Sequence, residues 1–318
     1  MCKNSDDDTG LNKSIFDLLP MSERLNKYHS ELYGFEERTY YLWYDAFSLY
    51  EYFTIQSQEV NSVYKNRYCQ IAADEKDLVF SVIFRLHAKS CVVAKEVLAL
   101  MRSGYPDGAN ARCRTLNEFV IICLFIAKHG NEVAKRFDDH RTIETYKAAS
   151  EFQKYCKQRG ELPFSTEEIE SLKKKQDELI ALYQKSFKGN YGWAAGVLKN
   201  PKPNLTDLMK DVELSYLSPS YRMASWSIHA SNAKCMMFTL TSPPEEDIIL
   251  TGESNIGMAD PGCSAAMSLW HMNRILITLR ENQNNQLILD SMTVLVDKMC
   301  KAFIDIHNSI DTKYVRMT

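Results

Sequence analysis

The stretch FVIICLFIA at residues 119–127 decides the fold, because it is apolar on every side of a helix and contains no helix breaker. A helix that is hydrophobic all round lies in the centre of a larger helical assembly. We therefore expect a central helix over residues 109–129. Its first half also carries Arg114 and Glu118, which are four residues apart and share one face. A charged stripe on a buried helix has to be paired or has to line a cavity.

Helix signals continue toward the N-terminus. Over residues 74–101, leucine and valine recur at spacings of three, four and seven, which predicts a second apolar helix. Residues 25–68 are rich in aromatic side chains, with Gly34 as the one clear breaker, so we expect a short helix before Gly34 and a long one after it. Aromatic side chains at this density more often pack in a core or an interface than form a ligand cage.

Helix signals also continue toward the C-terminus, where Ser165 and Glu168 have the spacing of a capping box. Residues 239–262 are rich in proline and glycine and predict an irregular excursion between helices. The remaining helices are expected at residues 131–157, 167–187, 205–209, 220–237, 263–281 and 287–307. The predicted fold is all-α, a multi-helix bundle with an excursion near residues 239–262.

The 318 residues divide into three regions by their composition. Residues 1–12 are polar and acidic, which predicts a disordered leader. Residues 13–70 form the expected N-terminal helical region. Residues 71–318 form the expected helical bundle domain, which carries the candidate site.

Composition limits the class of protein. The net charge of −3 disfavours a protein that wraps duplex nucleic acid, because neutralising phosphates requires a basic surface. The nine cysteines are scattered and none form a C-x-x-C pair, so we expect no zinc site and no disulfide framework. No signal peptide and no membrane-spanning apolar run is seen, which predicts a cytoplasmic protein. Without a P-loop or dinucleotide motif, no cofactor is expected.

One pair of residues suggests chemistry. Arg222 and His229 are seven positions apart, which brings them to within roughly 20° of one helix face. Tyr221 and Ser225 lie near that face. A histidine transfers protons near neutral pH and an arginine stabilises charge on a phosphate, which suits metal-independent cleavage of RNA. The alternative is that Arg222 pairs with an acid such as Glu118 and that His229 is a core residue.

Three motifs carry a resemblance to a family of uncharacterised bacterial helical proteins, known only as a domain of unknown function. They are Arg114-x-x-x-Glu118, Tyr191-Gly-Trp-Ala194, and Tyr221-x-x-x-Ser225-x-x-x-His229. The resemblance covers roughly residues 75–310 and implies a helical fold and a bacterial source.

The spacing Arg222-x6-His229 is also similar to the Arg-x(4–6)-His motif of the HEPN (higher eukaryote and prokaryote nucleotide-binding) superfamily. That similarity implies a helical bundle, often a homodimer, and ribonuclease activity in antiphage or toxin–antitoxin systems. In those systems a cognate inhibitor is a further expected partner. A polar residue commonly follows the arginine of the motif, whereas here Met223 does.

The segment from Lys185 to Lys202 interleaves basic and aromatic residues and contains no acid. Such a pattern suits single-stranded nucleic acid, because bases stack on aromatic rings and lysines follow the phosphates. The candidate contacts are Lys185, Lys188, Tyr191, Trp193 and Lys199. The alternative is a solvated loop that Trp193 anchors to the bundle.

Two functions follow from these patterns. The first is a HEPN-like metal-independent ribonuclease or effector that binds RNA. In it Arg222 and His229 are catalytic, and the supporting residues are Arg114, Glu118, Tyr221 and Ser225. The second is a non-catalytic helical module or regulatory subunit that binds a partner protein.

The pair Arg136 and His140, beside two aspartates, is expected to lie on a solvated helix face.

Overall fold

The computed structural model describes residues 20–226 and 252–310, and in these residues every regular element is a helix. The elements are α2 (Met21–Leu42), α3 (Tyr44–Asp74), α4 (Leu78–Arg102), α5 (Pro106–His129), α6 (Asn131–Tyr155), α7 (Thr166–Tyr183), α8 (Ala195–Leu198), α9 (Leu205–Asp211), α10 (Ser218–Trp226), α12 (Ala259–Thr278) and α13 (Asn285–Ser309), with the short 3-10 turns η1 (Lys185–Lys188), η2 (Gly192–Ala194) and η3 (Ser215–Leu217). The all-α prediction is confirmed.

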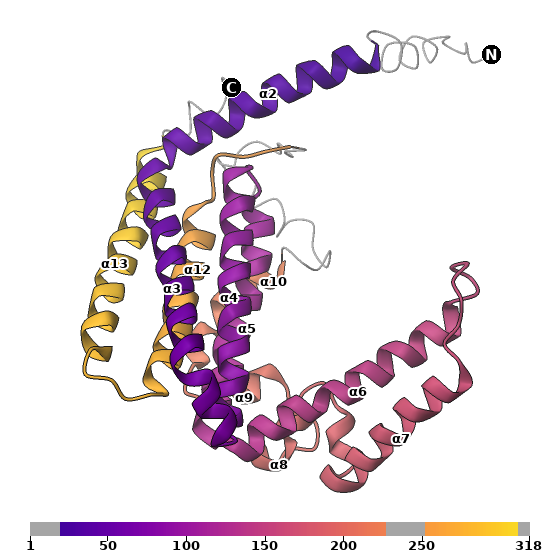
Figure 1. Ribbon diagram of the computed structural model, residues 1–318. Helices are drawn as coiled ribbons and strands as arrows, with labels where there is room; N and C mark the ends of the chain where they lie inside the picture. Colours follow the sequence, from indigo (N-terminus) through magenta and orange to yellow (C-terminus); the bar gives the residue numbers. More distant parts are fainter. Residues whose placement is uncertain (1–19, 227–251, 311–318) are drawn as a thin grey trace, which may run out of the picture.

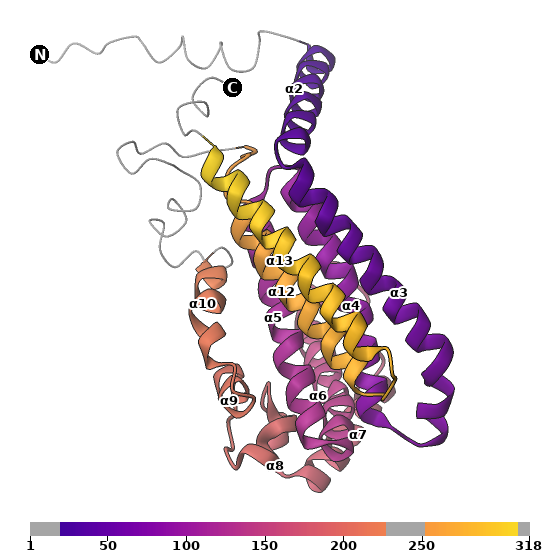
Figure 2. The same ribbon diagram turned by 90° about the vertical axis from the view of Figure 1, so that its left-hand side faces the viewer.

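Helix α5 lies at the centre of the bundle, between α4, α12 and α10 (Figure 2). Helices α3 and α13 form the outer layer against α4 and α12. Leu116, Ile121, Phe125 and Ile126 of α5 have no exposed surface. The apolar stretch that identified this helix therefore fills the core, as expected of a helix with no polar face in that half.

The N-terminal helices differ from the prediction. Helix α2 continues through Gly34, since a single glycine costs only about 1 kcal/mol in a helix. The break comes at Trp43, whose fully buried indole donates to the Asn255 carbonyl oxygen at 2.9 Å. Only Thr39 of α2 is buried, and both views show this helix leading away from the bundle (Figure 1).

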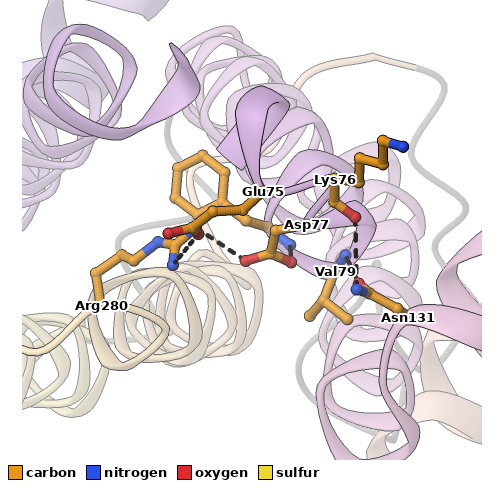
Figure 3. Close-up of polar contacts among 7 residues, drawn as sticks. Glu75, Lys76, Asp77, Val79, Asn131 and Arg280 are labelled. Atoms are coloured by element: carbon orange, nitrogen blue, oxygen red, sulfur yellow. Dashed lines mark hydrogen bonds and ion pairs between the residues drawn. The ribbon is translucent and has the colours of Figure 1, made fainter. Parts of the chain in front are cut away.

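The turn between α3 and α4 is clamped from two sides (Figure 3). Arg280, just after α12, pairs with Glu75 at 3.2 Å and with Asp77 at 2.9 Å. Asp77 also caps α4 by accepting from the Phe80 amide, so α4 begins at Leu78 and not at residue 74. On the other side, Asn131 accepts from the Val79 amide at 3.1 Å. The turn thus links α3, α4, α6 and α12.

Helices α6 and α7 lie side by side in a hairpin that projects from the bundle (Figure 1). The predicted capping box at the start of α7 is confirmed, with Ser165 accepting from the Glu168 amide and Glu168 accepting from the Ser165 amide. Of the predicted excursion, residues 239–251 lie outside the described part. Residues 252–258 are irregular, and α12 starts at Ala259, ahead of Pro261 and Gly262.

Candidate functional site

A polar cluster lies where α5 faces α10. Arg114 and Glu118 occupy successive turns of α5, while Leu116 and Asn117 between them point into the core. The Arg114 guanidinium lies over the ring of Tyr221 on α10, with its carbon 4.7 Å from the ring centroid. The charged stripe that the sequence predicted on α5 therefore faces α10, and it is partly buried there.

The loop before α8 supplies a third member of the cluster. The Tyr191 hydroxyl donates to Glu118 Oε1 at 2.6 Å. Burial raises the pKa of Tyr191, and the acceptor carboxylate of Glu118 raises it further, so the hydroxyl stays protonated. Next in the chain, Gly192 lies so close to the Phe187 carbonyl oxygen that an added Cβ would be 2.3 Å from it. The tight turn that places Tyr191 therefore requires glycine at 192.

Arg114 has no counter-charge within ion-pair distance among the described residues, although Glu118 is close enough that both groups act on the Tyr191 hydroxyl. It forms no ion pair with a carboxylate there, and its buried Nε has no hydrogen-bond partner. Glu118, the nearest acid on its own helix face, has taken Tyr191 as its donor. A partly buried cation without a counter-ion attracts anions, and one fixed by stacking on a ring is already oriented to bind them.

The other predicted site residues lie on or beyond α10. Arg222 is exposed and forms no ion pair with the described residues, so the suggested Arg222–Glu118 pair is absent. The Ser225 hydroxyl donates to the Tyr221 carbonyl oxygen at 2.8 Å, which commits it to its own helix. His229 lies outside the described residues.

The basic segment around η1 and α8 has an exposed and a buried part. Lys185, Lys188 and Lys199 are exposed. Trp193 is 3% exposed, with its ring packed edge-on against Phe125 and Phe137. A ring enclosed in this way cannot stack on a base, so Trp193 anchors the segment to α5 and α6.

The prediction that Arg136 and His140 lie on a solvated face of α6 is wrong. Arg136 is 8% exposed and His140 is 5% exposed. The Arg136 Nε donates to the Trp193 carbonyl oxygen at 2.8 Å, and the His140 Nε2 donates to the Gly189 carbonyl oxygen at 2.8 Å. The sequence did contain the signal, since Arg136 and His140 share the helical spacing of the buried residues Val133 and Ile143.

Two classes of site are not seen in the described part of the chain. No three side chains of histidine, cysteine, aspartate or glutamate come together there as metal ligands would. None of the helices that it contains has the length and apolar character needed to cross a membrane.

A family model described as a family of unknown function (DUF5677) matches residues 80–245, which is more than half of the chain. The matched stretch includes Arg114, Glu118, Tyr191 and Tyr221. No curated protein matches the chain, and neither does any solved structure.

Proposed function

The chain belongs to the family of unknown function DUF5677, and we propose that it is a metal-independent ribonuclease of the HEPN type. The observation that carries this proposal is the Arg114 guanidinium, which has no counter-charge within ion-pair distance among the described residues and is stacked on Tyr221. Tyr221 immediately precedes Arg222, the exposed cation of the Arg-x6-His motif. In this proposal, Arg114 of α5 and Arg222 of α10 each contribute one cation to the bound phosphate.

The proposed reaction uses the 2′-hydroxyl of RNA as nucleophile. His229 takes the proton of that hydroxyl, and its oxygen forms a bond to the adjacent phosphorus. The bond from phosphorus to the 5′-oxygen breaks, and that oxygen takes a proton from a water molecule as it leaves, while His229 later returns its proton to the solvent. Arg222 and Arg114 stabilise the negative charge that develops on the phosphorane oxygens. The products are a 2′,3′-cyclic phosphate and a 5′-hydroxyl.

Glu118 and Tyr191 act as positioning residues in this proposal. By donating to Glu118 Oε1, Tyr191 holds that oxygen in place, and we propose that this keeps the carboxylate from turning toward Arg114. The guanidinium then remains available to the substrate. The exposed Lys185, Lys188 and Lys199 provide further phosphate contacts along a single strand. Bacterial antiphage defence or growth control, in a homodimer held by a cognate inhibitor, is the proposed setting.

The test is incubation of the purified full chain with labelled RNA in the presence of a chelator. We expect cleavage that leaves cyclic-phosphate ends and that His229→Ala or Arg222→Ala reduces by at least about 100-fold. Ser225→Ala is the matched control, because its hydroxyl is committed to the α10 backbone. Cleavage that depends on an added metal ion, or that survives both substitutions, would contradict the proposal.

A second function is favoured by one observation on α2. This 22-residue helix has a single buried residue, and it exposes aromatic rings such as Tyr28, Tyr33 and Tyr41. Tyrosine is enriched in the contact surfaces of protein complexes. We therefore propose, as the alternative, a module that binds a partner protein through α2. Under this alternative, the double variant Tyr33→Ala with Tyr41→Ala abolishes the effect of the protein on cell growth or phage resistance, whereas His229→Ala leaves that effect unchanged. Loss of the effect in His229→Ala, with no loss in the double variant, excludes the alternative.

A further inference from the structure

Besides Arg114, another arginine of the described residues is shielded from solvent and forms no ion pair with them, and it lies at the base of the α6–α7 hairpin. The Arg136 guanidinium carbon is 4.7 Å from the ring centroid of Tyr183 and 5.6 Å from that of Phe187. A Cβ added at Gly196 would lie 3.1 Å from Cζ, 3.2 Å from Nη1 and 3.2 Å from Nη2. Because these three distances are nearly equal, Gly196 lies above the plane of the Arg136 guanidinium. The guanidinium is therefore fixed by rings and by backbone.

The bonding of Arg136 is incomplete. Its Nε donates to the Trp193 carbonyl oxygen, but Nη1 and Nη2 have no acceptor among the described residues. No carboxylate of those residues forms an ion pair with it, although the side chain is almost fully buried. Aromatic rings offset only about 0.5–2 kcal/mol of the cost of burying a cation. Nη1 and Nη2 keep contact with the solvent of a neighbouring pocket, so an anion bound there would offset the cost of burying the charge.

The free edge of the guanidinium faces a pocket with a volume of about 400 Å³. Lys199 and Ser186 line the pocket beside Arg136, and no acidic residue does. Leu182, Ala195 and Pro201 give it an apolar side. The nearby Asp139 accepts from Lys135 and from the Tyr183 hydroxyl, so its charge is already balanced.

We propose that this pocket binds a phosphate group, either as inorganic phosphate or as the terminal phosphate of a small organic molecule. The planar fork of Arg136 presents two parallel donors to two phosphate oxygens, and Lys199 supplies a second positive charge for the dianion. A carboxylate would leave Lys199 without a partner. The proposal concerns α6, α7 and α8, and it does not rest on the ribonuclease activity of the α5–α10 face.

The experiment is titration calorimetry of the full chain with three probes: inorganic phosphate, AMP and adenosine. We expect saturable binding of phosphate and AMP, weakened by added salt, and no binding of adenosine at the pocket. Binding of AMP at least about tenfold tighter than that of phosphate identifies an organic phosphate, since the apolar side then contributes. Equal affinities identify inorganic phosphate.

Three variants assign the binding to this pocket. Arg136→Met should remove the affinity for both anions, but Arg136 also holds the Trp193 carbonyl group, and its loss affects folding. Gly196→Ala keeps every charge, suits a helix and pushes against the guanidinium, so we expect about tenfold weaker binding in a folded protein. Lys199→Gln should weaken binding several-fold and reduce its salt dependence.

Lys174→Gln is the matched control, because Lys174 is exposed on α7 and does not line the pocket. We expect this variant to bind AMP and phosphate like the unchanged protein. Absence of binding for both anions overturns the proposal. It is equally overturned if Gly196→Ala and Lys199→Gln fold normally and bind with unchanged affinity.

Discussion

At the scale of single residues, the buried His87 links the α3, α4 and α12 helices through a polar network. Its Nε2 lies 3.0 Å from Asn273 Oδ1, and its Nδ1 lies 3.1 Å from Asn61 Nδ2. Asn273 Oδ1 can only accept and the Asn61 amide nitrogen can only donate, so the neutral ring protonated on Nε2 satisfies both. Among the described residues, no carboxylate pairs with this imidazole to balance a positive charge on it.

This network predicts how stability depends on pH. Burial lowers the pKa of His87 from 6.5 to about 4 in the folded protein. Between those values the unfolded chain binds a proton that the folded chain does not, so stability is complete above pH 6.5 and falls toward pH 4. The loss from this one group is about 3 kcal/mol. Urea unfolding at several pH values should give a shallower pH dependence for His87→Gln, and equal slopes for both proteins would contradict the assignment.

Tyr191 gives a second prediction at this scale. Tyr191→Phe leaves the partly buried Glu118 carboxylate without its donor, so the free energy of unfolding should fall by about 1–3 kcal/mol. In the proposed enzyme it also frees Glu118 to pair with Arg114, which should lower the cleavage rate. Tyr155→Phe serves as control, because Tyr155 is 47% exposed. Urea unfolding with no difference between the two variants would contradict the role given to Tyr191.

At the scale of helices, sequence periodicity predicted most of the elements but few of their ends. Helix α5 was identifiable because its apolar stretch has no polar side. The start of α4 was placed at Asp74, although Asp77 just before the apolar run is a local N-cap signal. What the sequence could not show is the second bond of Asp77, to Arg280, which is 203 positions away. Arg136 and His140 were misjudged because their residue types were given more weight than their place on the apolar stripe of α6.

The clamp on the α3–α4 turn is testable. Asp77→Ala removes both the cap of α4 and one partner of Arg280, whose side chain is 19% exposed. Loss of a cap costs about 1 kcal/mol, and Arg280 keeps Glu75 but loses its second, partly buried partner, which adds to that cost. We expect a decrease of about 2–3 kcal/mol in urea unfolding. Asp290→Asn on the exposed face of α13 should change stability by less than about 0.5 kcal/mol, and equal effects would contradict the clamp.

At the scale of the whole molecule, the candidate site is assembled from three segments far apart in the chain. Glu118 and Tyr191 are 73 positions apart, and Arg114 meets Tyr221 across the α5–α10 contact. The three motifs could be recognised in the sequence. The contacts between them could not be predicted, because local sequence patterns do not show which helices become neighbours. The fold also placed Ser225 and Trp193 in structural roles that motif spacing did not separate from functional ones.

The most direct measurement compares two arginines of α5 in the RNA cleavage assay with chelator present. Arg114 has no counter-charge within ion-pair distance among the described residues, whereas Arg112 forms an ion pair with Glu96. If the α5–α10 face binds the reacting phosphate, Arg114→Gln should lower the cleavage rate by about 100-fold while Arg112→Gln leaves it within a few-fold of the unchanged protein. Equal rates for the two variants, with both folded, would contradict that role for Arg114.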